Sequence, residues 1–188
     1  ALEARNRGRF AFGCEEALGY SVGALVRDKD GISAAVWLAE LAARELREGK
    51  SLVDRLHALY ARHGVWASAQ RSLFRSGAHA RASFRERIDA LVGNPPRALG
   101  GESFRGGTDY RTGAESRPPW LGVSDLFELR YGSSTRVLVR PSGTEPKLKL
   151  YVDHEENPKQ YATTEEAVRC ARDRAEAMAE TVLTLLSD

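Results

Sequence analysis

Cysteine, histidine and long apolar runs are all scarce in this sequence. The two cysteines, Cys14 and Cys170, lie far apart, so they show neither the spacing of a redox pair nor that of a metal site. The four histidines are scattered along the chain and form no ligand cluster. No apolar run approaches the length of a membrane span and no signal peptide opens the chain, so we expect a cytoplasmic protein without membrane contact.

A large excess of charge of one sign is absent as well. The 188 residues carry a net charge of only +2, with 42% hydrophobic and 29% charged residues, which is typical of a soluble globular protein of one domain or two small ones. Arginine makes up 23 of the 28 basic residues, an excess that either genome composition or anion binding explains. The chain opens with Ala1 instead of an initiator methionine and soon reaches an Arg/Gly stretch, so we expect it to be part of a longer protein.

The most informative feature that is present is a polar turn between two strand patterns, at residues 140–151. Apolar residues alternate on both sides of it, and two prolines bound a segment of hydroxyls, free N–H groups and one glycine. A guanidinium precedes the turn, and Lys147 and Lys149 fall on one face of the strand that follows. Such a concave set of donors and cations suits a phosphate dianion, although a solvated basic hairpin has the same pattern. The residues expected to bind phosphate are Arg140, Ser142, Gly143, Thr144 and Lys149.

Hydrophobic periodicity predicts an α/β region at 1–66 and an α+β region at 67–188. In the first region a strand at 9–13 and a second apolar run precede a helix capped by Asp30, whose wide apolar face predicts burial on a sheet. A further helix begins with a capping arrangement of Ser51 and Asp54.

The second region alternates helix and strand patterns. We read 65–73 as a hinge, followed by a helix that ends at Gly93. The Gly/Pro-rich stretch 93–123 is predicted to be ordered but irregular, with a strand around Ser103 and Phe104. Three strands and a last helix follow. They are expected at Asp125–Tyr131, Arg136–Val139, Leu148–Asp153 and from Thr163 or Thr164 onward, the helix burying a stripe of Val168, Ala171, Ala175, Met178, Val182 and Leu185.

Two adjacent carboxylates, Glu15 and Glu16, lie in a glycine-flanked loop. Carboxylates accept hydrogen bonds from neighbouring sugar hydroxyls, and the glycines allow the backbone to come close to a ligand. A solvated acidic loop is the alternative reading. The segment Asp28-Lys29-Asp30 has the alternation of a cation site, but Asp30 is expected to cap a helix and Lys29 would repel a cation, so no metal site is predicted.

These motifs together resemble those of the α-D-phosphohexomutases. Arg-Pro-Ser-Gly-Thr-Glu-Pro-Lys, followed by a Tyr-Val-Asp strand, is similar to the phosphate-binding loop in the last domain of that family, and Phe-Gly-Cys-Glu-Glu-Ala-Leu-Gly-Tyr to the sugar-binding loop of the third domain. The form of the second motif looks most like the branch that includes phosphopentomutases. Many mutases place a serine where this chain has Ala17, so the preferred sugar does not follow from the motif.

The resemblance implies a role for each loop. Glu15 inherits the contact with ring hydroxyls, with Glu16 beside it, and Arg27 and Lys29 are expected to line the substrate cleft. Ser142 is implied to donate to phosphate and not to act as a nucleophile, since the family's phosphoserine loop lies in another domain. No catalytic residue is therefore expected in this chain, and the Mg²⁺ of the complete enzyme is expected outside it.

The implied fold is part of mutase domain 3 followed by domain 4, an antiparallel sheet with helices that resembles the TATA-box-binding protein. The implied activity is an isomerase that moves phosphate between the 1- and 6-positions, or the 1- and 5-positions, of a sugar through a phosphoserine and a bisphosphate intermediate. The partners would be the phosphosugar and the N-terminal domains of the same enzyme, and the isolated chain would be inactive.

Two other functions are compatible with parts of the sequence. A non-catalytic sugar-phosphate sensor would use the same two loops. A polyanion or nucleic-acid module would use the basic residues Arg71, Arg75, Arg81, Arg85, Arg87 and Arg97, but the small net charge and the lack of a base-stacking aromatic motif speak against it.

Overall fold

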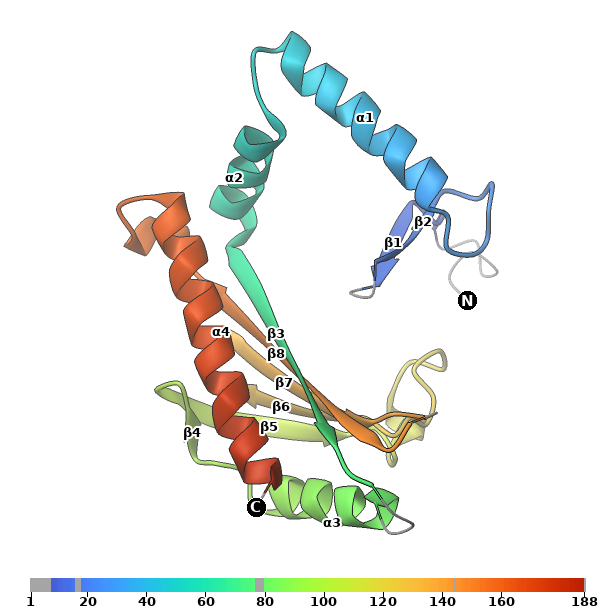
Figure 1. Cartoon of the computed structure of the whole chain (residues 1–188), viewed down its shortest axis with the longest axis vertical. Helices are drawn as coiled ribbons and strands as arrows, with labels where there is room; N and C mark the ends of the chain where they lie inside the picture. Colours follow the sequence, from blue (N-terminus) through green and yellow to red (C-terminus); the bar gives the residue numbers. More distant parts are fainter. Residues whose placement is uncertain (1–7, 16–17, 77–79, 144, 188) are drawn as a thin grey trace. The chain divides into compact units, whose positions relative to one another are not determined.

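In the computed structural model, residues 8–15, 18–76, 80–143 and 145–187 are described. The chain divides into two compact units, residues 1–59 and 60–188, and each is considered by itself (Figure 1). None of the helices in these described ranges is both long enough and apolar enough to cross a membrane.

The first unit combines a two-stranded antiparallel ribbon with helices. Its elements are β1 (Phe12–Glu15), β2 (Gly19–Val22), α1 (Gly31–Arg47) and the start of α2 (Leu52–His63). The predicted cap of α1 is confirmed, because Asp30 Oδ1 accepts from the N–H of Ile32 at 3.0 Å and Oδ2 accepts from the hydroxyl of Ser33. This hydroxyl holds the pKa of Asp30 below its ordinary value.

The predicted burial of the apolar face of α1 is wrong for the residues described. Ile32, Val36 and Leu46 are all exposed, Ile32 by 80% of its surface. The described part of this unit holds a sheet of two strands, and so small a sheet cannot cover a 17-residue helix. An apolar groove of about 830 Å³ runs between the ribbon and α1, lined by Phe12, Tyr20 and Trp37 among others.

The second unit is an antiparallel sheet in the order β3-β8-β7-β6-β5-β4. Its strands are β3 (Val65–Phe74), β4 (Ala98–Leu99), β5 (Glu102–Asp109), β6 (Phe127–Tyr131), β7 (Thr135–Pro141) and β8 (Lys147–Glu156). The helices are α3 (Ala80–Gly93), the short η2 (Ala114–Ser116) and η3 (Pro158–Gln160), and α4 (Thr164–Ser187). The α/β and α+β fold classes predicted from the sequence are confirmed. Strands β6 and β7 lie close to their predicted bounds, β8 continues past the predicted Asp153 to Glu156, α3 ends at the predicted Gly93 and α4 begins at the predicted Thr164.

The predicted hinge at 65–73 is wrong. This segment is β3, an edge strand paired with β8 along its whole length, from Val65 opposite Glu156 to Phe74 opposite Lys147. Its small and polar side chains hide the strand period, and the partner that stabilises it lies some 80 residues later in the chain. Only the tertiary pairing therefore reveals the strand.

Helices α3 and α4 pack on one face of this sheet (Figure 1). The main core joins inward-facing strand residues to helix residues such as Phe84, Ile88 and Met178, and burying each large apolar side chain is worth roughly 1.5–3 kcal/mol. A smaller cluster consists of Val65, Ala167 and Ala171. The predicted stripe of α4 is correct in its middle, at Ala171, Ala175, Met178 and Val182. At its start Ala167 is buried and Val168 only partly so, and at its end Leu186 is buried and Leu185 is half-exposed. The predicted residues repeat slightly more often than once per helical turn of 3.6 residues, so the predicted and the observed stripes diverge toward the ends of the helix.

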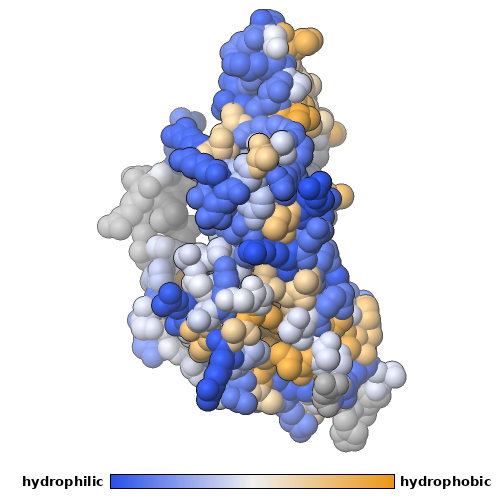
Figure 2. All heavy atoms as spheres, turned by 90° about the vertical axis from the view of Figure 1, so that its left-hand side faces the viewer, coloured by the Kyte–Doolittle hydropathy of each residue, from blue (hydrophilic) through white to orange (hydrophobic). Residues whose placement is uncertain are grey.

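In the lower part of the view in Figure 2, hydrophobic side chains gather among hydrophilic ones. The second unit has a groove of about 960 Å³, which is lined by residues of α3, α4 and the segment between α3 and β4, among them Leu91, Pro96 and Leu185. None of the described residues that the sequence assigns to sugar or phosphate binding lines this groove, although Arg87 and Arg97, considered above for polyanion binding, do. We therefore place the functional site elsewhere, at the β7–β8 turn.

Candidate functional site

The β7–β8 turn is closed by backbone hydrogen bonds. The N–H of Ser142 donates to the carbonyl of Lys147 at 2.8 Å, and the N–H of Lys147 donates to the carbonyl of Glu145 at 2.8 Å. The hydroxyl oxygen of Ser142 accepts from the N–H of Glu145 at 3.4 Å, so the hydroxyl can still donate its own hydrogen to a further acceptor. The turn is thus ordered at both sides of Thr144, which itself lies outside the described residues.

Gly143 does not adopt the positive φ that glycine permits. The backbone alone therefore does not require glycine here. A Cβ at this position would meet no other atom within 4 Å. The residue therefore leaves open space at the tip of the turn, where a ligand can approach the backbone.

Arg140 and Lys149 lie directly opposite each other at the ends of β7 and β8. Burial alternates along both strands, with Val139, Leu148 and Leu150 in the core, so the two cations project from the face that α3 and α4 leave uncovered. Neither side chain forms a hydrogen bond or ion pair within the described parts of the chain. Two adjacent cations without an acidic partner favour the binding of an anion.

The third cation of this region, Lys147, is already neutralised. Its Nζ lies 2.5 Å from Glu145 Oε2 and 5.6 Å from the centre of the Phe74 ring. Lys147 thus supports the shape of the turn, and the sequence-based expectation of three cations around an anion is reduced to two.

In the first unit, the structure brings Glu15 and Lys29 together. Glu15 Oε1 lies 3.7 Å from Lys29 Nζ, and both side chains are more than half exposed. A Cβ on Gly19 would lie 2.5 Å from Lys29 Cδ and 3.2 Å from Glu15 Oε2, so glycine is what lets the two side chains meet. The turn between β1 and β2 also holds Leu18 at a φ of 63°.

The other residues that the sequence predicts to bind substrate in the first unit are Arg27 and Glu16. Arg27 is exposed and lies two residues before Lys29. Glu16 and Ala17 lie outside the described residues. A carboxylate and an ammonium group side by side, open to solvent, match the acceptor and donor needs of vicinal hydroxyls.

Two family models match this chain. One, described as phosphoglucomutase/phosphomannomutase, alpha/beta/alpha domain III, matches residues 2–63, and the other, the C-terminal domain of the same enzymes, matches residues 111–171. The first contains the Glu15 loop and the second contains the Arg140 turn. The chain belongs to the α-D-phosphohexomutase superfamily.

Individual relatives agree with this assignment to the phosphohexomutases. A probable phosphomannomutase of Haemophilus influenzae is 35% identical over 144 residues, which cover 76% of this chain and 27% of the relative. A probable phosphoribomutase of Schizosaccharomyces pombe is 34% identical, over 81% of this chain and 28% of the relative, and human phosphopentomutase is 32% identical, over 77% and 25%. The chain thus spans about a quarter of the length of these relatives.

A solved phosphohexomutase structure has a similar fold. The open form of parafusin, a phosphoglucomutase of Paramecium, superposes with a TM-score of 0.62 over 99% of this chain and 31% of that protein, at 14% sequence identity. At this identity the likeness supports the fold alone.

A buried polar network in this phosphohexomutase chain was not anticipated from the sequence. His154 is 2% exposed, and its Nδ1 lies 2.7 Å from the hydroxyl of Thr135, while its Nε2 lies 3.0 Å from Glu156 Oε1. Arg174 of α4 donates to the same carboxylate oxygen at 2.8 Å. A hydroxyl, an imidazole and a carboxylate joined by successive hydrogen bonds resemble a proton relay. However, Thr135 is only 4% exposed, so its hydroxyl is shielded from a substrate. The network joins β7, β8 and α4.

Two of the basic residues that suggested nucleic-acid binding are paired with carboxylates of the chain. Arg71 contacts Glu176 and, at 2.7 Å, Glu180, both on α4, and Arg85 lies 3.9 Å from Asp125. Arg75 donates to the neutral hydroxyl of Ser83 at 2.9 Å. With these pairs and a net charge of only +2, a polyanion-binding function is not favoured.

Proposed function

We propose that this chain supplies sugar and phosphate binding in a phosphosugar mutase. The observation that carries the proposal is the pair Arg140 and Lys149, two opposed cations without an acidic partner among the described residues, close to the hydroxyl of Ser142 in the same turn. A phosphate monoester has three terminal oxygens and close to two negative charges, which these donors match. Arg140, Ser142, Gly143, Thr144 and Lys149 are proposed to hold it.

The proposed role of this turn is to grip the phosphate that does not react. In a mutase the sugar presents first one phosphorylated end and then the other, so a turn that accepts either phosphate orients the substrate in both half-reactions. Contacts remote from the reacting atoms raise the rate by holding the reactants in the right geometry. Glu15, Glu16, Arg27 and Lys29 are proposed to hold the sugar ring.

The chemical step is proposed to use residues outside these 188. A phosphoserine would donate its phosphoryl group to one sugar hydroxyl, and the resulting bisphosphate would return its other phosphate to the serine. Mg²⁺ bound outside this chain would stabilise the charge of the transferred group. The isolated chain is accordingly expected to show no mutase turnover.

The sugar itself is proposed only as a class. Relatives at similar identity are named for mannose, ribose, pentose and glucose phosphates, so transfer between positions 1 and 6 and between positions 1 and 5 both fit. A comparison of glucose 6-phosphate, mannose 6-phosphate and ribose 5-phosphate as ligands would decide between them.

The test compares the affinity of the chain for glucose 6-phosphate with that of two variants. Arg140→Ala removes an exposed guanidinium that makes charge-assisted hydrogen bonds, so we expect a loss of about 1.5–3 kcal/mol, or about 10- to 150-fold. Lys159→Ala is the control, since it also removes one exposed positive charge but lies in η3, beyond the opposite end of β8, and it should change the affinity less than about threefold. Calorimetry at fixed ionic strength measures both. An Arg140→Ala variant that binds as tightly as the wild type removes the phosphate role.

A further inference from the structure

Two rows of side chains cross the open face of β7, β8 and β3. In the first row Arg136 of β7 lies opposite Asp153 of β8, and Asp153 lies opposite Ser68 of β3. Arg136 Nη2 and Nε donate to Asp153 Oδ2 at 2.6 and 3.0 Å, and the hydroxyl of Ser68 donates to Asp153 Oδ1 at 2.6 Å. An arginine from one outer strand and a serine from the other thus hold an anion between them.

The second row repeats this arrangement four residues further along each strand. Arg140 of β7 lies opposite Lys149 of β8, and Lys149 lies opposite Ser72 of β3. A separation of four residues keeps the side chains on the same face and places the rows about 13 Å apart. The outer residues are again an arginine and a serine, but a lysine takes the place of the carboxylate.

The second row therefore has the donors of the first row without its acceptor. Among the described residues, neither Arg140, Lys149 nor the hydroxyl of Ser72 has a hydrogen-bond partner, whereas each member of the first row is paired. Two positive charges and a hydroxyl in one row complement an anion supplied from solution.

The contacts of Arg71, the neighbouring residue on β3, show to which face of the sheet the side chain of Ser72 points. Arg71 reaches Glu176 and Glu180 of α4, on the helix-covered face of the sheet. Successive side chains of a strand point to opposite faces, so Ser72 points to the open face that carries Arg140 and Lys149.

We infer that Ser72 donates its hydroxyl hydrogen to the same phosphate monoester that Arg140 and Lys149 bind, so that the phosphate site extends from the β7–β8 turn onto the edge strand β3. The inference rests on the proposed phosphate role of Arg140. In this arrangement the phosphate oxygens accept from Ser72 and Arg140 as the oxygens of Asp153 accept from Ser68 and Arg136. Lys149 adds the second positive charge that a dianion requires.

The experiment titrates the 188-residue chain with inorganic phosphate at fixed ionic strength, replacing chloride, and follows backbone amide shifts by NMR. Ser72→Ala should weaken phosphate binding about fivefold, and Ser72→Thr, which keeps the hydroxyl, should restore most of the affinity. The matched control is Ser68→Ala, on the same strand and face, which should leave the phosphate affinity unchanged because its hydroxyl serves Asp153. If Ser72→Ala proves unstable, Ser72→Val takes its place, because valine also lacks the hydroxyl donor but favours the strand conformation.

Each outcome of this titration is informative. If Ser72→Ala and Ser72→Val bind phosphate as the wild type does while Arg140→Ala binds it weakly, the role of Ser72 is refuted and the proposed function stands. Equal weakening by Ser68→Ala refutes it too, because the effect would then belong to the strand in general. If the wild-type chain binds no phosphate, or if Arg140→Ala has no effect, both the proposed function and this inference fail.

Discussion

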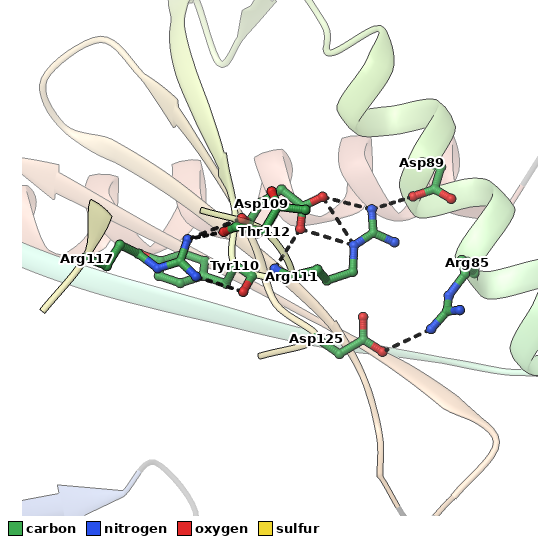
Figure 3. Close-up of polar contacts among 8 residues, drawn as sticks. All are labelled: Arg85, Asp89, Asp109, Tyr110, Arg111, Thr112, Arg117 and Asp125. Atoms are coloured by element: carbon green, nitrogen blue, oxygen red, sulfur yellow. Dashed lines mark hydrogen bonds and ion pairs between the residues drawn. The ribbon is translucent and has the colours of Figure 1, made fainter. Parts of the chain in front are cut away.

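Arg111 Nη2 lies 2.7 Å from Asp89 Oδ1, which ties the segment after β5 to helix α3 (Figure 3). The same guanidinium donates to Asp109, with Nη2 at 2.9 Å from Oδ2, and lies 4.3 Å from the centre of the Phe127 ring. Nearby, Arg117 donates to the carbonyls of Thr112 and Tyr110 at 2.5 and 3.0 Å, closing the loop before β6. Two arginines thus order a Gly/Pro-rich stretch that has little regular structure.

The Asp109–Arg111 pair predicts a pH dependence of stability. The hydrogen bond from Arg111 holds the pKa of Asp109 below its ordinary value of 3.8. A carboxyl with a lowered pKa contributes its stability above the ordinary value, and that contribution is lost as the pH falls from 3.8 through the lowered value. The free energy of unfolding of the wild type should therefore fall more than that of Asp109→Asn between pH 5 and pH 2, by about 1 kcal/mol.

Urea unfolding of both proteins across this pH range measures the difference. Parallel pH profiles for the wild type and Asp109→Asn would contradict the prediction. Arg111→Ala supplies a second check, since it should remove the same pH dependence while Asp109 is still present.

The buried carboxylate of Glu156 predicts a large loss of stability when it is removed. Glu156→Leu leaves His154 without its acceptor and frees Arg174, which returns to solvent because its side chain is already 53% exposed. We expect a loss of about 3 kcal/mol, the lower end of the range for breaking a buried pair. Thermal or urea unfolding measures it.

Glu155→Gln is the control for this variant, because Glu155 is the next residue on β8 and points to the open face. It should change the free energy of unfolding by less than about 0.5 kcal/mol. If the two variants had the same stability, the His154 network would contribute nothing to the attachment of α4.

Replacing Gly19 should weaken the binding of a sugar phosphate while leaving the stability of the first unit nearly unchanged. In Gly19→Ala the new Cβ would displace Lys29, whose Cδ lies 2.5 Å from its position, and so separate Lys29 from Glu15. The side chain of Lys29 is flexible and exposed, so stability should change by less than about 1 kcal/mol, while affinity for glucose 6-phosphate should fall several-fold. Calorimetry and thermal unfolding of the same sample distinguish the two effects.

Gly31→Ala is the matched control for Gly19→Ala. A Cβ at Gly31, the first residue of α1, meets no atom within 4 Å, so sugar phosphate affinity should be unchanged. Alanine also favours the helix, so stability should rise slightly. Loss of affinity in both variants would argue against a specific role of the Glu15–Lys29 pair.

Local chemistry made several features predictable from the sequence. The caps of three helices depend on residues within a few positions of one another, as in the reciprocal hydrogen bonds of Ser51 and Asp54 at 2.7 and 3.1 Å. At the start of α4 the N–H of Glu166 donates to the hydroxyl of Thr163, and the Glu166 carboxylate accepts from the N–H of Ala162. Side-chain periods of 2 and 3.6 residues likewise predicted the last three strands and the buried stripe of α4.

The sequence by itself determined the helices, the last three strands and the donor-rich turn at Arg140, because propensity, capping and turn chemistry act over a few residues. The tertiary structure decided which of these residues are available to a ligand. It made 65–74 a strand through a partner some 80 residues away, neutralised Lys147 through Glu145, and left Arg140 and Lys149 without an acidic partner among the described residues. The reason is physical: charge compensation and strand pairing depend on which side chains the fold brings within a few ångströms, and neighbours in space need not be neighbours in the chain.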